Sequence, residues 1–386
     1  MLPEYRITAG FMPLTDSLLL VAAHEKGFGA AEGIDLTLIR ETSWANIRDR
    51  IAVGHFDVAH MLAPMPIAAS LGLTPISAPV IAPFALGLGG NAVTVSMALW
   101  RRMKTANAPD DLSPGPVGTA LAQVVGSTEQ KLRFAVVHQH SGHNYELRYW
   151  LAASGIDPDR QVEIVVLPPP LMADALSAGR IDGYCVGEPW NSVGVASGAG
   201  RIATVKAAIL PLSPDKVLGA TASWAADNPG ALAALLRALQ GAAQWCAEPE
   251  NHREAASLLA QPRYLNLPAM KIGHGLSGRL DVGAGAMVAV EDFFVPAAHH
   301  ATFPSATYAM WFYSQMVRWA DVAHTAANVD RARASFRPDL YRSALGTLAA
   351  DLPPDDSPLG RTSFFDAKPF DPTDVAVYIA SQRPYA

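Results

Sequence analysis

Residues 179–190 read Gly-Arg-Ile-Asp-Gly-Tyr-Cys-Val-Gly-Glu-Pro-Trp, and this stretch decides the fold because residues 54–65 repeat its plan. In both stretches a Gly follows a helical pattern, an Asp lies three residues later, and a Pro lies seven residues after the Asp. A short, mostly apolar strand pattern separates the Asp from the Pro. Such short spacings also arise by chance, but the likeness continues upstream, where the strand patterns 36–39 and 162–167 each follow a Gly-Ile-Asp.

The two repeats predict an α/β fold with two lobes. Each half alternates strands with helices, which is the plan of paired right-handed βαβ units on a mostly parallel sheet flanked by helices. Ligands of such sheets bind beyond the carboxyl ends of the strands. We therefore expect a ligand cleft between lobe 1, formed by residues 1–88 and 191–386 with the C-terminal helices and tail, and lobe 2, formed by residues 89–190.

Composition and charge narrow the functional classes. The chain has 386 residues, of which 50% are hydrophobic and 17% charged, so it can bury two cores. Its net charge is −6 and its Lys and Arg residues are scattered, which argues against direct nucleic-acid binding. No uncharged apolar run is long enough for a membrane span, because residues 18–23 are followed by His-Glu-Lys and residues 76–95 contain several Pro and Gly.

The ends of the chain and its cysteines bear on the compartment. A strand pattern begins at Ile7, which leaves no space before it for the charged and apolar regions of a signal peptide. Cys185 lies in a strand pattern and Cys246 in a helical pattern, so both are expected to be buried and reduced. These features predict a cytoplasmic protein.

Two loops carry candidate binding residues in the first half. Trp44 follows a polar loop and precedes a helical pattern, so it could be part of the core or point its indole N–H into the cleft. The Gly-rich residues 84–91 suit a chain that crosses from one lobe to the other with accessible backbone N–H groups. They do not form a phosphate loop, because the required Gly-Lys-Ser/Thr is absent.

Histidines cluster in the second half. Ser141 is a plausible N-cap for a helix over residues 144–154, which would put His143 in the first turn, where unpaired N–H groups attract anions. With His138 and His140 it could instead form a metal site. No Cys or acidic ligand lies at the spacing of a structural zinc site, so we expect no metal and no cofactor.

Six sequence signatures, in order, closely resemble the nitrate and bicarbonate branch of type II periplasmic-type solute-binding proteins over nearly the whole chain. They are Gly10-Phe11-Met12-Pro13-Leu14-Thr15-Asp16, Ser43-Trp44-Ala45-Asn46-Ile47-Arg48-Asp49, Ala59-His60-Met61-Leu62-Ala63-Pro64-Met65-Pro66, Arg148-Tyr149-Trp150-Leu151-Ala152-Ala153, Pro168-Pro169-Pro170 and Cys185-Val186-Gly187-Glu188-Pro189-Trp190. Within the branch, the missing signal peptide and residues 81–91 look most like the cytoplasmic NasS-type nitrate and nitrite sensors. The resemblance implies a two-lobed periplasmic-binding-protein fold with the ligand between the lobes.

The resemblance also implies the site residues, which are Trp44, Asn91, His143, Lys216 and Gly187. The family's transport proteins carry Gln where this chain has Asn91, so the amide remains on a shorter stem. Nitrate is a planar, weakly basic monoanion that needs converging N–H donors and about one positive charge, with no negative group nearby. On this reading Lys216 supplies the charge, and Asn91 and Trp44 supply neutral donors.

The expected function is therefore that of a cytoplasmic sensor. The resemblance implies that it binds nitrate or nitrite and holds a NasT-type RNA-binding antiterminator, which it releases when the anion binds. The alternative is the substrate-binding component of a nitrate, or related anion, ABC transporter. An enzyme is not expected, because neither the cysteine-rich motif of thiamine-pyrimidine synthesis nor a Gly-x-Ser-x-Gly nucleophile motif is present.

Overall fold

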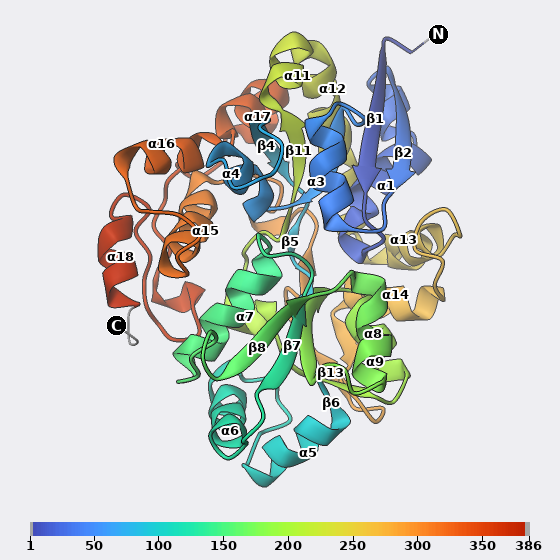
Figure 1. Cartoon of the computed structure of the whole chain (residues 1–386). Helices are drawn as coiled ribbons and strands as arrows, with labels where there is room; N and C mark the ends of the chain where they lie inside the picture. The colour runs from blue at the N-terminus through green and yellow to red at the C-terminus, as the bar shows by residue number, and fades with distance from the viewer. Residues whose placement is uncertain (1–2, 383–386) are drawn as a thin grey trace.

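The computed structural model describes residues 3–382 and arranges them in two lobes, each built on one five-stranded sheet (Figure 1). The sheet of lobe 1 has the strand order β2-β1-β3-β11-β4, and the sheet of lobe 2 has the order β8-β7-β9-β6-β10. The strands of lobe 1 are β1 (Tyr5–Phe11), β2 (Ile34–Arg40), β3 (Val58–Leu62), β4 (Val80–Ala85) and β11 (Lys216–Thr221). The strands of lobe 2 are β6 (Asn91–Ser96), β7 (Leu132–Val136), β8 (Val162–Val166), β9 (Gly183–Gly187) and β10 (Gly200–Val205). Short pairs are formed by β5 (Leu88–Gly89) with β14 (Phe294–Val295) and by β12 (Arg279–Asp281) with β13 (Met287–Ala289).

The two sheets share one plan, which confirms the predicted two-lobed, mostly parallel fold. In each sheet four strands run one way and the strand second from one edge runs the other way, namely β11 in lobe 1 and β6 in lobe 2. These two opposed strands are also where the chain changes lobe, since β6 follows β4 and β11 follows β10. Because β10 pairs with β6, the sheet of lobe 2 continues beyond residue 190, where the sequence placed the end of that lobe.

The repeated Gly and Asp hold equivalent positions in the two lobes. The Oδ2 atom of Asp57 accepts a hydrogen bond of 2.8 Å from the backbone N–H of Thr8 in β1, and the Oδ2 atom of Asp182 accepts one of 2.8 Å from Arg133 in β7. Each Asp also donates its own N–H to the carbonyl of that same residue, over 3.0 Å and 2.7 Å. The preceding glycines have φ of +75° and +65°, a left-handed conformation that side chains disfavour. The repeat is therefore structural.

Helices cover both faces of each sheet (Figure 1). Between the strands of lobe 1 and lobe 2 they are α1 (Leu18–Glu25), α2 (Phe28–Ala31), α3 (Trp44–Ala52), α4 (Pro64–Ser70), α5 (Met97–Thr105), α6 (Pro114–Gly126), α7 (Gly142–Ala153), α8 (Met172–Ser177), α9 (Trp190–Ala196) and α10 (Lys206–Ile209). After β11 they are α11 (Ala222–Asp227), α12 (Pro229–Ala247), α13 (His252–Leu259), α14 (Ala269–Ser277), α15 (Ala306–Arg318), α16 (Ala326–Ala334), α17 (Pro338–Leu345) and α18 (Val375–Ser381). Within residues 3–382 no helix is both long and apolar enough to cross a membrane.

Two helices begin at the junction of the lobes with a capping serine. The hydroxyl of Ser141 accepts the N–H of Asn144 at 3.0 Å at the start of α7, as the sequence predicts. The hydroxyl of Ser43 accepts the N–H of Asn46 at 3.2 Å at the start of α3. Both caps fix the first helical turn, and Trp44 and His143 lie in those turns.

The C-terminal segment runs along both lobes. Figure 1 shows α15 between α4 of lobe 1 and α7 of lobe 2, with α16 beside α4 and α18 on the outer side of α15. Two hydroxyls of α7 hold this segment, since Tyr145 donates to Asp321 over 2.7 Å and Tyr149 donates to Asp366 over 2.5 Å. Residues 351–372 have little regular structure, as their Pro and Asp content predicts, and most of them lie at the surface, although Phe364 and Phe370 are buried.

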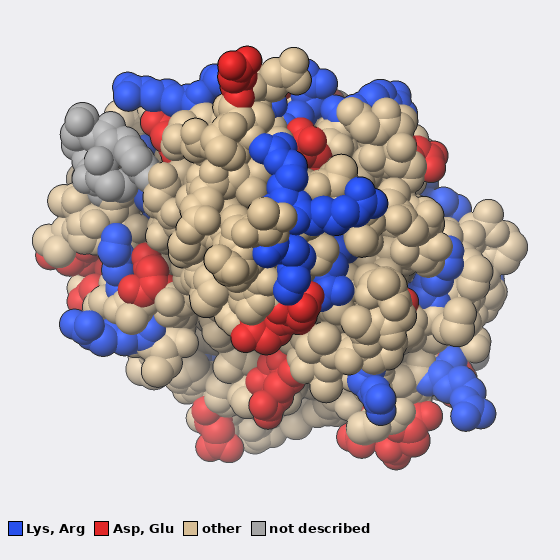
Figure 2. Space-filling view, turned by 90° about the horizontal axis from the view of Figure 1, so that it is seen from below, with Lys and Arg blue, Asp and Glu red and all other residues tan. Residues whose placement is uncertain are grey.

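The lower face of lobe 2 carries both signs of charge. Figure 2 shows Lys and Arg side chains gathered near the middle of this face, with Asp and Glu next to them. In this lobe Asp110 pairs with Lys104 and with Arg201, at 2.8 Å in each case. The basic side chains are therefore partly neutralised by acidic neighbours.

We predict that Asp57→Ala and Asp182→Ala lower the free energy of unfolding by similar amounts, about 1–2 kcal/mol each. Each substitution removes an acceptor from one strand N–H at an equivalent point of the two lobes. Urea denaturation followed by circular dichroism measures both, with the exposed Asp35→Ala as a control that should change little. A several-fold difference between the two variants would show that the two positions are not equivalent.

Candidate functional site

The structure brings the five predicted residues together where the lobes meet. Trp44 in α3 and Lys216 at the start of β11 belong to lobe 1, and the ammonium of Lys216 lies 5.5 Å from the centroid of the Trp44 ring. His143 in α7, Asn91 at the start of β6 and Gly187 at the end of β9 belong to lobe 2. All five are buried, the most exposed of the four side chains reaching only 1%.

Gly187 has no side chain, so Leu14, Asn91 and Asp16 can approach its Cα atom closely. A Cβ atom at this position would lie 2.9 Å from Leu14, 3.3 Å from the Asn91 Oδ1 atom and 3.5 Å from the Asp16 Oδ2 atom. Gly142, in the first turn of α7, has a similar role, since a Cβ atom there would lie 2.4 Å from Asp215 Oδ1. Both glycines allow polar groups of different elements to approach one another.

Lys216 lies between two carboxylates. Its ammonium is 2.9 Å from Asp16 Oδ2 and forms an ion pair with Asp215, the residue before it in the chain. The expectation that no negative group lies near Lys216 is therefore wrong. Burial alone would lower the pKa of Lys216, but the two carboxylates raise it overall, so the side chain is charged at neutral pH.

The two aspartates are held ionised by their neighbours. Burial would raise the pKa of Asp16, but Lys216 and His60 lower it below its usual value. Burial would likewise raise the pKa of Asp215, and here His143 and Lys216 lower it. Sequence reasoning missed both residues, although Asp16 ends the first signature and Asp215 adjoins Lys216.

A second ion pair lies behind Asn91. Glu146 in α7 pairs with Lys206 in α10, and Lys206 also donates to the carbonyl of Pro214 over 3.1 Å. The other carboxylate oxygen of Glu146 accepts the Asn91 amide N–H over 3.3 Å. Glu146 follows His143 by three residues on one helix, a spacing that puts both on the same face and could have pointed to it.

The histidines divide into two groups. His143 lies 3.5 Å from Asp215, and burial lowers its pKa to about 3, so it is neutral at pH 7. His60 lies 3.0 Å from Asp16 and packs edge-on against Trp44. His138 and His140 form the other group. The backbone N–H of His140 donates to the His138 ring over 3.0 Å, and the His140 ring contacts the Tyr145 hydroxyl at 3.0 Å. The three histidines of residues 138–143 therefore do not converge, and no group of three or more potential metal ligands occurs among residues 3–382.

Buried polar atoms without hydrogen-bond partners gather at this junction. They include the indole N–H of Trp44, both ring nitrogens of His143, the Asn91 Oδ1 atom and the Asp215 Oδ1 atom. Buried polar groups in folded proteins nearly always have partners. Several unpaired atoms from different elements in one buried place therefore indicate a site for a small polar ligand.

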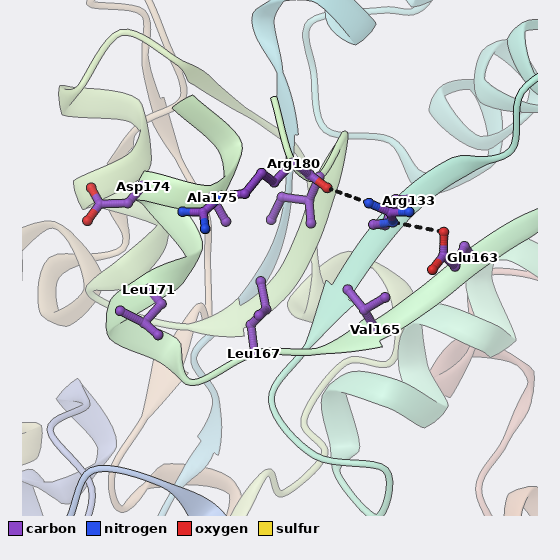
Figure 3. Close-up of a pocket in the computed structure, with 9 residues that line it drawn as sticks. Arg133, Glu163, Val165, Leu167, Leu171, Asp174, Ala175 and Arg180 are labelled. Carbon is purple, nitrogen blue, oxygen red and sulfur yellow. Dashed lines mark hydrogen bonds and ion pairs between the residues drawn. The ribbon is translucent and has the colours of Figure 1, made fainter. Parts of the chain in front are cut away.

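A cavity of about 410 Å³ lies elsewhere on lobe 2, between α8 and the strands β7 and β8 (Figure 3). Figure 3 shows Arg133 between the Arg180 carbonyl, at 3.3 Å, and the Glu163 carboxylate, at 2.8 Å. Most of its other lining residues are apolar. None of the buried unpaired polar atoms found in residues 3–382 belongs to its lining residues, so its size does not make it the anion site.

Glu188 ties the site to the crossover between the lobes. Its carbonyl accepts the N–H of Thr15 in lobe 1 over 2.8 Å, and its own N–H donates to Gly90 over 3.0 Å. One carboxylate oxygen accepts the N–H of Ser192 at 3.2 Å, and burial raises the pKa of Glu188 to about 7. These contacts assign Glu188 to the hinge, while Asp182 has the structural position described above.

Comparison with known proteins finds one family, and several of its members have names that refer to nitrate. The profile of the NMT1-like family matches residues 2–260. The nitrate/nitrite binding protein NrtA of Synechococcus elongatus is 33% identical over 390 residues, which cover 98% of this chain and 86% of that protein. The nitrate import ATP-binding protein NrtC of Synechocystis sp. is 33% identical over 98% of this chain, which spans 55% of that protein. The crystal structure of the periplasmic nitrate-binding protein NrtA from Synechocystis PCC 6803 has a TM-score of 0.87 at 27% identity and covers 99% of this chain and 100% of its own. The relatives that match along most of their own length are binding proteins and not enzymes.

We predict that Lys216→Met lowers the free energy of unfolding by roughly 3–5 kcal/mol near pH 7, because it leaves two buried carboxylates without their cation. The folded-state pKa values of Asp16 and Asp215 lie below the ordinary value of 3.8, so the ion pairs stabilise the wild type above that pH and are lost as the pH falls through the folded-state values. The loss caused by Lys216→Met should therefore shrink in acid.

Denaturant unfolding at several pH values measures this loss. The control is Lys26→Met, which breaks a more exposed pair with Glu254 at 2.6 Å and should cost less than about 1 kcal/mol. Equal losses in the two variants would contradict the buried position of Lys216.

Proposed function

This chain belongs to the NMT1-like family and, within it, to the nitrate- and bicarbonate-binding solute-binding proteins, and from that premise we propose that it binds nitrate or nitrite between its lobes. The observation that carries the proposal is the set of unpaired donors around Lys216. The Trp44 indole N–H comes from lobe 1 and the His143 ring from lobe 2, so a ligand between them contacts both lobes. Neutral His143 donates one N–H from the tautomer that suits the ligand.

The charge of the site favours a monoanion over a dianion. Lys216 and Lys206 contribute two positive charges, and Asp16, Asp215 and Glu146 are the acidic groups that face them. With three carboxylates facing two lysines, the site has no spare positive charge for any anion, so a dianion such as sulfate, with two charges to desolvate, is opposed more strongly than a monoanion. Nitrate and nitrite spread one charge over a small planar group, which directed N–H donors can satisfy.

The destination of the bound anion is proposed from the relatives. NrtC is named as an ATP-binding protein of nitrate import, and this chain matches about half of its length. NrtA is named as a nitrate/nitrite binding protein, and it matches along nearly the whole chain. We therefore propose that this chain is the substrate-binding component of a nitrate ABC transporter, which passes the anion to a membrane permease.

A second proposal is the cytoplasmic sensor that holds a NasT-type antiterminator. It is favoured by residues 81–91, whose sequence resembles the NasS type and which form β4, β5 and the first residue of β6. This segment carries the chain between the lobes and ends at Asn91, so an anion at Asn91 would act directly on the crossover. In this proposal the sensor releases the antiterminator when nitrate or nitrite binds, and the antiterminator contacts the RNA. Gel filtration with the antiterminator, with and without nitrate, and fractionation of the source cells separate the two roles.

We predict that nitrate raises the melting temperature and that sulfate does not, because a ligand that binds only the folded state stabilises it. Trp44→Phe should weaken nitrate binding about tenfold, since it removes one donor whose bond contributes about 1–1.5 kcal/mol. Thermal shift and isothermal titration calorimetry measure the two effects.

The matched control is Trp224→Phe on α11, which begins at the end of β11 opposite Lys216; Trp224 is partly exposed, and its substitution should leave the affinity unchanged. Tighter binding of bicarbonate than of both nitrate and nitrite would contradict the proposal.

A further inference from the structure

The Asn91 amide turns its acceptor, not its donor, toward the ligand side. Its Nδ2 atom donates to Glu146 over 3.3 Å, and its Oδ1 atom is buried without a partner. The Oδ1 atom points to the side of Gly187, where a Cβ atom would lie 3.3 Å from it and 3.5 Å from Asp16. An ionised carboxylate can only accept hydrogen bonds, so ionised Glu146 holds the amide in this orientation.

This orientation does not suit the proposed ligands. Nitrate and nitrite have no hydrogen to donate, so the Asn91 Oδ1 atom would face another acceptor. The charges oppose binding as well, because two lysines already face three carboxylates in a buried place. A bound monoanion would leave two uncompensated negative charges there, which burial makes costly.

We propose that Glu146 takes up one proton when nitrate or nitrite binds, and that the Asn91 amide then turns over. The proton goes from solvent to the Glu146 Oε2 atom, which donates it to Asn91 Oδ1, so that Nδ2 faces the anion. The Oε1 atom of Glu146 keeps its contact with Lys206 throughout. The inference rests on the proposed function, and it makes Glu146 a positioning residue that selects among monoanions.

Glu146 is the carboxyl group at the site that can take the proton. The groups that face it are Lys206 from α10, Asp215 before β11, Asn91 in β6 and the buried thiol of Cys185 in β9. Burial, with a contribution from Asp215, raises the pKa of Glu146 despite Lys206.

The neighbouring groups at the site resist protonation. The pKa values of Asp16 and Asp215 lie below the usual range, and burial lowers that of His143 to about 3. Glu188 at the hinge is another buried carboxyl, and burial raises its pKa to about 7. Glu188 therefore serves as the matched control.

Bicarbonate provides a contrast because it carries its own hydroxyl. That hydroxyl can donate to Asn91 Oδ1 while Glu146 remains ionised. Bicarbonate binding should then take up no proton at Glu146, whereas nitrate and nitrite binding should take up about one. The same pair of residues thus separates monoanions with a proton from monoanions without one.

The test is calorimetric titration of the wild-type protein with nitrate in two buffers that differ in ionisation enthalpy. The expected result is uptake of about one proton per nitrate, with Kd rising about tenfold per pH unit above the pKa of Glu146 in the free protein, because one proton is linked to binding. Below that pKa the affinity should level off, since Glu146 is then already protonated.

Two variants assign the proton. Glu146→Gln carries a permanent amide donor for Asn91 Oδ1, so it should bind nitrate without proton uptake and bind bicarbonate more weakly than the wild type does. Glu188→Gln should retain the proton uptake. Proton uptake that persists in Glu146→Gln and is lost in Glu188→Gln would overturn the inference. Nitrate binding to the wild type without proton uptake would also overturn it, and this measurement does not depend on whether Glu146→Gln folds. If nitrate binds without proton uptake, the proposed function stands and only the inference fails. If neither nitrate nor nitrite binds, the proposed function and the inference both fail.

Discussion

The structure depends on one constraint, which is that two lysines and three carboxylates are buried together where the lobes meet. Lys216 joins Asp16 to Asp215, and Lys206 joins Glu146 to the turn before β11. Buried charges are tolerated only when each has its partners in good geometry, and removing one partner is far more costly than the pair is stabilising. The ion pairs therefore require the elements that carry them to keep fixed relative positions. They hold the segment after β1, the starts of β6, β11 and α10, and the first turns of α7 in a fixed relation, and that relation defines the site.

The fold could be predicted from the sequence because its decisive signals are local. The Gly that ends a helix in a left-handed conformation and the Asp three residues later, which holds the neighbouring strand, act within a few residues or between adjacent strands. Their repetition predicts two like lobes. The end of the second sheet could not be read in this way, since β10 belongs to it through pairing with β6 about a hundred residues earlier. The Pro and Asp of residues 351–372 describe that segment's lack of helices, but not the burial of Phe364 and Phe370.

At the site, too, local features could be predicted from the sequence, whereas contacts between distant residues could not. The structure brings together the residues that the resemblance implies, and Ser141 caps α7 as its sequence predicts. What the sequence could not supply is which charges meet at the site, because Lys206 and Glu146 are 60 residues apart and Asp16 and Lys216 about 200 apart. The presence of Lys216 suggested a positive site, whereas at the site three carboxylates face two lysines. The meaning of a lysine in a binding site depends on its partners as much as on its own charge.

The anchoring of α7 to the C-terminal segment affects how fast the two lobes can separate. Tyr145 and Tyr149 lie on the same helix as His143 and Glu146, and their hydroxyls are bonded to Asp321 and Asp366, while α15 also packs against α4 of the other lobe. A motion that separates the lobes must strain or break some of these contacts even when no ligand is present. Contacts that hold the lobes together oppose opening, so they would lengthen the residence time of an anion held between the lobes. A carrier that must unload at a membrane requires a short residence time, whereas a protein that averages the nitrogen supply over seconds benefits from a long one.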